Sequence, residues 1–182
     1  MNVVEFINCI LKEEIRRIQQ AYEWKHTYLS FGLIAGGIEF LGALCDRFDL
    51  NEGGHSEDRF NDAIVRFFDS QYRPYAVKSE PFKLYSNLRC GMLHVVIPVD
   101  KLILGERAND SSKYKHLNKY TTMGNERLFL MAEDFYEDFR SACDKAVIMI
   151  QDKSILKLPE IIKSSQKKKD ILYLKRDLLQ IE

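Results

Sequence analysis

Residues 26–48, HTYLSFGLIAGGIEFLGALCDRF, carry the pattern on which the fold depends. Apolar residues occupy nearly every position, so a helix here would be hydrophobic around its circumference, as is typical of a helix buried among others. Gly32, Gly36, Gly37 and Gly42 recur along it, and a residue without a Cβ lets a neighbouring helix approach closely. The pattern therefore predicts a central helix with close neighbours.

Amphipathic segments on both sides of this helix are candidates for its neighbours. Apolar residues recur at helical spacing within residues 3–22, and a second such stripe follows Ser56, a candidate helix cap. Another helix is expected over residues 81–94, because proline suits a first turn and Pro98 ends the segment. The last long helix begins near Ala132, with a predicted buried stripe of Phe135, Phe139, Ala142, Cys143, Ala146 and Ile150.

The hydrophobic period changes before that last helix. Lys101–Leu104 and Arg127–Met131 are short apolar runs on either side of a polar stretch, and they predict a small β-hairpin with a long, exposed connection. The expected fold is mainly α: a helical bundle with a small β-hairpin inserted before the last core helix. Residues 1–150 form the predicted domain, with the hairpin at about 101–131, and residues 151–182 form an amphipathic, basic C-terminal extension.

Composition narrows the class of protein. The chain has 182 residues, with 27 Lys and Arg against 27 Asp and Glu, which argues against a dedicated binder of duplex DNA. The N-terminal stretch lacks the features of a secretory signal, and the apolar window is too interrupted for a membrane span. The four cysteines are widely spaced and expected to be reduced. A cytoplasmic protein without membrane contact is expected.

The stretch over residues 85–98, YSNLRCGMLHVVIP, holds the candidate chemistry. Arg89 and His94 are separated by four residues near the end of a predicted helix. The spacing is weak by itself, since a chain of this composition is expected to hold about one such pair by chance. The sequence LRCGMLH, which follows two long predicted helices, nevertheless resembles the R-x4-6-H motif of the HEPN superfamily in its usual helical context. Members of this superfamily are small helical dimers, and many are metal-independent ribonucleases.

This resemblance implies a homodimer that brings two Arg89–His94 pairs into one cleft and acts on RNA or a nucleotide without metal or cofactor. His94 would take the ribose 2′-OH proton or protonate the leaving oxygen, and Arg89 would hold the phosphate. Glu39, alone in the apolar helix, is the candidate to orient either residue, and Asn87 is a second supporting candidate. The implied product ends in a 2′,3′-cyclic phosphate, as a toxin or phage-defence ribonuclease would leave it.

Other interpretations stay open. Catalytic family members usually carry a polar residue after the arginine, whereas this chain carries Cys90, which favours a non-catalytic HEPN-like module for dimerisation or for binding a nucleotide or partner. On an ideal helix Arg89 and His94 lie about 140° apart, so a salt-bridged arginine and a helix-capping histidine are equally compatible with the sequence. A protein partner held by the C-terminal extension, or a helical scaffold without a site, are further possibilities.

Overall fold

A computed structural model gives the structure of the protein and describes residues 2–20, 27–50 and 52–152. Over these residues the fold is mainly helical, with a small three-stranded mixed sheet before the last long helix, which confirms the predicted fold class. The predicted C-terminal extension falls almost wholly outside the described residues.

The N-terminal helix runs without a break through α1 (Val3–Phe6), the π-helical η1 (Ile7–Glu14) and α2 (Ile15–Gln20). It begins at a capping box in which the Asn2 side chain accepts from the Glu5 backbone and the Glu5 carboxylate accepts from that of Asn2. Its buried apolar stripe consists of Ile7, Leu11 and Ile15.

Helix α3 (Thr27–Ala43) is the central helix that the sequence predicts, and it packs against α4 (Ser56–Phe67). A Cβ on Gly42 would lie 1.8 Å from the Arg59 carbonyl oxygen of α4, so this crossing requires glycine. A Cβ on Gly37 would lie 2.5 Å from the Phe139 ring of the last long helix, whereas Gly36 has open space beside it. Glycines therefore set the distance between α3 and two of its neighbours.

The start of α4 corrects the predicted cap. His55, rather than Ser56, occupies the N-cap position, and its carbonyl accepts from the Arg59 backbone N–H. The His55 ring stacks on Phe48 at a centroid distance of 3.6 Å, which fixes the entry of the chain into the helix. After α4 the chain forms the 3-10 helix η2 (Ser70–Ala76).

The helix that carries the candidate motif begins later than predicted. Residues 81–83 form a turn, the π-helical η3 spans Tyr85–Cys90, and α5 spans Gly91–His94. The buried Asn87 side chain donates to the carbonyls of Pro81 and Lys83, so it stabilises the turn in place of a first helical turn. The predicted end at His94 agrees with the structure.

The predicted hairpin is wrong in its strand pairing. Strand β1 (Leu102–Gly105) pairs in parallel with β3 (Asn125–Met131), and β2 (Lys119–Thr122) forms the antiparallel hairpin with β3. Only Met123 and Gly124 join β2 to β3, both at positive φ, as a type I′ turn requires. The polar stretch between the two apolar runs therefore contains a strand of its own and the short helix α6 (Arg107–Asp110).

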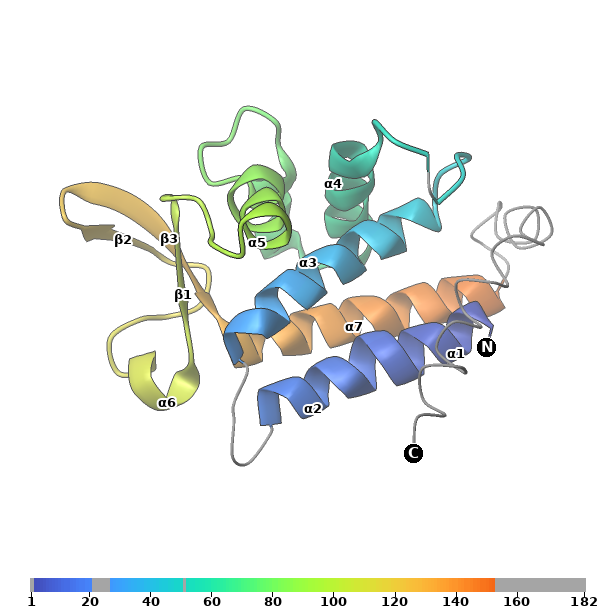
Figure 1. Cartoon of the computed structure of the whole chain (residues 1–182), viewed down its shortest axis with the longest axis horizontal. Helices are drawn as coiled ribbons and strands as arrows, with labels where there is room; N and C mark the ends of the chain where they lie inside the picture. Colours follow the sequence, from blue (N-terminus) through green and yellow to red (C-terminus); the bar gives the residue numbers. More distant parts are fainter. Residues whose placement is uncertain (1, 21–26, 51, 153–182) are drawn as a thin grey trace.

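Helix α7 (Ala132–Gln151) follows β3 directly and runs antiparallel to the N-terminal helix (Figure 1). Its predicted stripe is buried, except that Ile150 is half-buried and Tyr136 is buried in addition. Helix α3 crosses these two helices, α4 and α5 lie on its other side, and the sheet projects from one end of the bundle (Figure 1). The core lies between these layers.

A buried hydrogen-bond network ties the sheet to the helices. The Met131 N–H donates to His116 Nδ1 at 2.9 Å, so the proton of the neutral ring is on Nε2, which lies 2.7 Å from the Tyr72 hydroxyl oxygen. Tyr72 in turn donates to Asp138 of α7 at 2.7 Å. Three segments distant in the sequence thus meet at one polar cluster, which holds the sheet in place.

The buried thiols and phenols predict a loss of stability in alkali. Burial raises the pKa of Cys143 to about 12 and that of Cys45 to about 11, and burial with Asp138 raises that of Tyr72 well above its usual value. The unfolded chain releases these protons at lower pH, so the free energy of unfolding stays level below about pH 8.5 and falls above it. Cys143 alone contributes roughly 2 kcal/mol of loss by pH 10.5. Urea midpoints at pH 7, 8.5 and 10.5 measure the fall, and equal midpoints would contradict it.

No helix among the described residues is both long and apolar enough to cross a membrane.

Candidate active site

The structure brings Arg89 and His94 into direct contact. Arg89 lies near the end of η3 and His94 ends α5, and Arg89 Nη1 lies 3.3 Å from His94 Nε2. The long arginine side chain spans the angle that separates the two positions on the helix. A guanidinium can only donate, so this contact requires a neutral imidazole that accepts at Nε2 and carries its proton on Nδ1.

Glu39 holds Arg89 in this position. Its Oε2 accepts from Arg89 Nε at 2.6 Å across the interface between α3 and η3, and both side chains are largely buried, at 16% and 18% exposure. Partial burial opposes the charge on Arg89, but the hydrogen bond and charge of Glu39 outweigh it and raise the arginine pKa. The pair leaves Arg89 Nη2 without a hydrogen bond among the described residues, so the guanidinium retains a donor for a ligand.

Tyr85, which the sequence did not single out, lies beneath the guanidinium. Arg89 Cζ is 5.6 Å from the centre of the Tyr85 ring, one helical turn earlier, in a cation–π contact. Burial first, and then the neighbouring Cys90, raise the pKa of the Tyr85 phenol. Cys90, the departure from the family pattern, thus contacts Tyr85. The four-residue spacing of Tyr85 and Arg89 is a signal from which this stack could have been predicted.

The structure places Asn87 outside this group. Its side-chain amide donates to backbone carbonyls that precede η3, and its backbone carbonyl accepts from the Val99 N–H at 2.9 Å. Asn87 therefore shapes the helix that carries Arg89 and makes no contact with Arg89 or His94 through these bonds.

The chain turns sharply after His94. The Gly91 carbonyl accepts from both Val95 and Ile97, and a Cβ on Gly91 would lie 2.4 Å from the Ile97 oxygen, so the turn packs directly on the helix. Val96 adopts φ +60°, a left-handed conformation that glycine normally takes at a helix end and that costs a β-branched residue about 1–2 kcal/mol. A strained turn therefore adjoins the candidate site.

Exposed apolar residues lie on both sides of His94 in the chain and on the adjoining part of α3. The first half of α3 meets the end of α5 here, since Gly32 contacts Met92 and Leu93 and the Tyr28 hydroxyl donates to the Val96 carbonyl at 2.8 Å. We call the exposed residues of this region the apolar face: Tyr28, Leu29, Leu33, Leu93, Val95, Val96, Ile97 and Val99. Exposed apolar clusters of this kind mark interaction sites.

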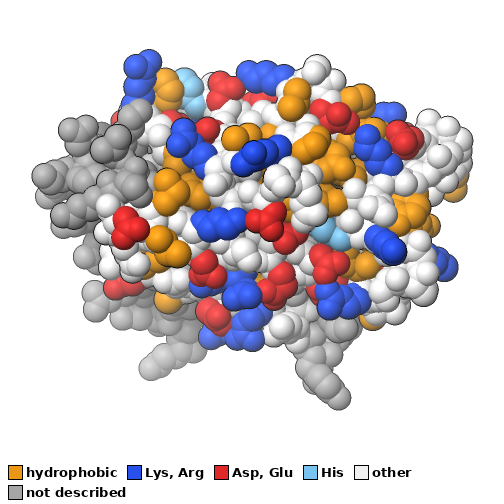
Figure 2. Space-filling view, turned by 180° about the vertical axis from the view of Figure 1, so that it is seen from behind, with side chains coloured by type: hydrophobic (Ala, Val, Ile, Leu, Met, Phe, Trp, Pro, Cys, Tyr) orange, Lys and Arg blue, Asp and Glu red, His pale blue; other side chains and the backbone are white. Residues whose placement is uncertain are grey.

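The face of the molecule seen from behind in Figure 2 carries charges of both signs. Figure 2 shows Lys and Arg side chains interspersed with Asp and Glu over the described part of that face. Charges of the two signs alternate there, in agreement with the equal totals in the sequence. The described part of this face shows no continuous basic surface of the kind that an extended nucleic acid binds.

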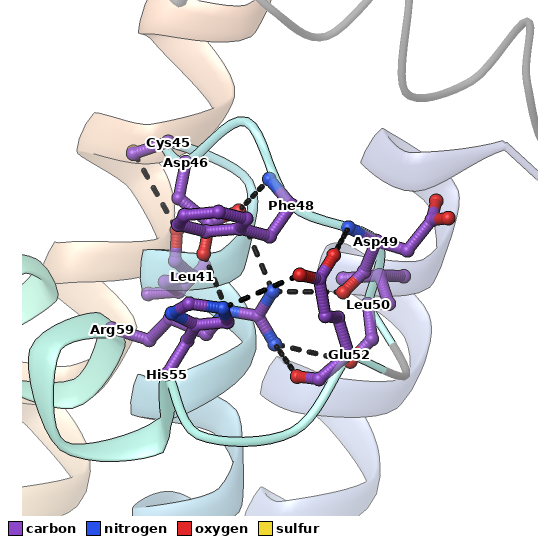
Figure 3. A network of polar contacts seen from close by, with 9 residues as sticks. All are labelled: Leu41, Cys45, Asp46, Phe48, Asp49, Leu50, Glu52, His55 and Arg59. Carbon is purple, nitrogen blue, oxygen red and sulfur yellow. Dashed lines mark hydrogen bonds and ion pairs between the residues drawn. The ribbon is translucent and has the colours of Figure 1, made fainter.

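A second polar cluster has a structural role. Arg59 of α4, 4% exposed, donates to Asp46 and to the carbonyls of Asp49, Leu50 and Glu52 (Figure 3). The loop after α3 wraps around the guanidinium and satisfies all three of its nitrogens. This cluster explains why α3 ends at Ala43, earlier than the predicted Phe48.

The described residues contain no group of three or more His, Cys, Asp or Glu side chains placed to bind a metal ion. Comparison of the chain with protein-family models, curated proteins and solved structures found no match. Membership of the HEPN superfamily therefore stays a prediction from the sequence motif.

Proposed function

We propose that the protein is a HEPN-like, metal-independent endoribonuclease that uses Arg89 and His94. The observation that carries the proposal is the contact between the two side chains, with Arg89 held by Glu39 at a partly exposed edge. This arrangement combines a phosphate-binding cation with a neutral imidazole, the two groups that phosphodiester transesterification needs.

The geometry supports a sequence of steps. A substrate phosphate attracts the Arg89 guanidinium, and the Nη1 that lay against His94 then turns to a phosphate oxygen, which frees the Nε2 lone pair. His94 Nε2 takes the 2′-OH proton, the 2′-oxygen attacks phosphorus, and the bond to the 5′-oxygen breaks. The leaving oxygen takes a proton, and the products are a 2′,3′-cyclic phosphate and a 5′-hydroxyl. Arg89 stabilises the charge that develops on the phosphorane.

A homodimer is part of the proposal, and the apolar face is its interface. The face borders His94, so a two-fold axis through it would bring two Arg89–His94 pairs near one another. One histidine, in its neutral form, would then act as base, while the second, turned from its arginine and in its protonated form, gives its proton to the leaving oxygen. The strained, exposed Val96 gains a contact for its side chain in such an interface.

The interface has a direct mutational test. Ile97 is 63% exposed on the apolar face, and Ile148 is 56% exposed on α7, so Ile97→Asp and Ile148→Asp form a matched pair. A charge at the centre of an interface disfavours association by several kcal/mol. We expect Ile97→Asp to sediment as a monomer and Ile148→Asp as the wild type does. A wild-type monomer at micromolar concentration, or an Ile97→Asp dimer, would contradict this interface.

The activity itself is tested on paired substrates in EDTA. We expect the wild type to cleave an RNA oligonucleotide and leave intact the same sequence made as DNA or with 2′-O-methyl riboses, because the attacking 2′-OH is missing there. An Arg89→Ala variant is expected to leave all three intact. Cleavage of the DNA, or cleavage of RNA only after Mg²⁺ is restored, would contradict the proposal.

A non-catalytic HEPN-like binding or dimerisation module is the second candidate. It is favoured by Cys90 and by the ion pair with Glu39, which would also suit a purely structural arginine. RNA left intact by the wild type, together with a dimer that Ile97→Asp dissociates, would support this function instead.

A further inference from the structure

Helix α3 contacts Arg89 and the turn that follows His94. Glu39 accepts from Arg89, and Tyr28 donates from its hydroxyl to the Val96 carbonyl, two residues beyond His94. The two α3 residues are 11 positions apart, which is three turns plus about 20°, so they lie on one face of the helix. Between them Gly32 lies beside Met92 of α5, where a Cβ would be 3.6 Å from that of Met92, an ordinary van der Waals contact. One face of α3 is thus shaped to receive the helix that bears Arg89 and His94.

The Tyr28 bond has no equivalent elsewhere in the turn. The other hydrogen bonds of residues 95–97 run back to Gly91, within the helix that carries His94. Among the described residues, the Tyr28 hydroxyl makes the one hydrogen bond that ties the turn to another helix. Because Val96 holds a left-handed conformation unfavourable for valine, the turn tends to relax unless something restrains it.

We propose that Tyr28 is a positioning residue for His94: through the Val96 carbonyl it fixes the strained turn that follows the histidine, and so places the imidazole against Arg89. The inference deepens the proposed ribonuclease function and rests on it for its kinetic consequence. Glu39 positions the arginine and Tyr28 the histidine, so α3 acts on both reacting groups from a single rigid element.

The test is Tyr28→Phe, which removes the hydroxyl and keeps the ring. The matched control is Tyr75→Phe, because Tyr75 also donates to the carbonyl of a residue at positive φ, Leu117, but in the sheet region. We expect Tyr28→Phe to lower kcat for RNA cleavage roughly three- to ten-fold with KM unchanged. We also expect it to shift and broaden the His94 Cε1–H NMR signal, assigned by its loss in His94→Ala. Tyr75→Phe is expected to change neither.

The outcomes separate this inference from the proposed function. If the wild type cleaves RNA and Tyr28→Phe leaves both kcat and the His94 signal unchanged, the positioning role is wrong and the ribonuclease stands. An increase in KM alone would place Tyr28 in substrate binding and overturn the inference. Changes in kcat and in the His94 signal as large with Tyr75→Phe as with Tyr28→Phe would overturn it too. If the wild type cleaves no RNA, the proposed function fails, and the NMR signal then decides: a shift specific to Tyr28→Phe supports positioning, and none overturns it.

Discussion

Replacement of Arg59 with methionine is expected to lower the free energy of unfolding by roughly 3–5 kcal/mol. The variant leaves the carboxylate of Asp46 without its cation, and it removes a donor from the carbonyls of Leu50 and Glu52 and one of the two donors to the carbonyl of Asp49, which keeps the Glu52 N–H. The loop drawn in Figure 3 wraps around the Arg59 guanidinium, so the end of α3 and the start of α4 are expected to loosen together.

Arg66→Met is the matched control, on the same helix. Arg66 is paired with Asp62 at 2.7 Å, but its side chain is 49% exposed, and exposed ion pairs contribute about 1 kcal/mol or less. Urea unfolding of both variants measures the difference. Equal midpoints for the two would show that the buried network contributes no more than a surface ion pair, against our account.

Replacement of His94 with alanine is expected to reduce the rate of RNA cleavage roughly 100- to 10,000-fold, the range for loss of a general acid or base. Stability is expected to change little, because His94 is exposed and its contact with Arg89 lies at the surface. The Glu39–Arg89 ion pair remains in the variant, so RNA affinity is expected to persist. Single-turnover rates with saturating protein separate binding from chemistry.

His55→Ala controls for loss of a histidine as such, since His55 stacks on Phe48 at the start of α4, outside the candidate site. It is expected to cleave RNA at the wild-type rate. Arg89→Lys tests the partner residue: it keeps the charge but loses the planar donor pair, and a rate close to that of Arg89→Ala is expected. A His94→Ala variant with more than a tenth of wild-type activity would contradict the assignment.

Much of the fold follows from hydrophobic periodicity, which is a local property of the sequence. The 3.6-residue stripe of α7 and the apolar, glycine-rich α3 are predicted because burial acts on each helix separately. The sheet was mispredicted because pairing is non-local: β1 reaches β3 in parallel, and the type I′ turn begins with Met123 instead of the usual Asn or Gly. The cap at His55 depends on its stack with Phe48, which spacing along the chain does not reveal.

The candidate site was predictable to a similar extent. A lone carboxylate in an apolar helix needs a partner, so Glu39 was a candidate to orient either Arg89 or His94, and the structure places it against Arg89. Asn87 was chosen for its proximity in sequence, and its amide caps a turn instead. Tyr28 could not be chosen, because its role depends on a strained backbone conformation at Val96 that no residue pattern encodes.

The chemical form of the RNA ends tests the central claim most directly. RNA is incubated in EDTA with wild type, and for the same time with His94→Ala, and the 3′ ends of any fragments are identified by mass spectrometry. The account predicts 2′,3′-cyclic phosphate ends with wild type and none above background with His94→Ala. Ends with 3′-hydroxyl and 5′-phosphate groups, or cyclic ends produced equally by both proteins, would contradict transesterification by the Arg89–His94 pair.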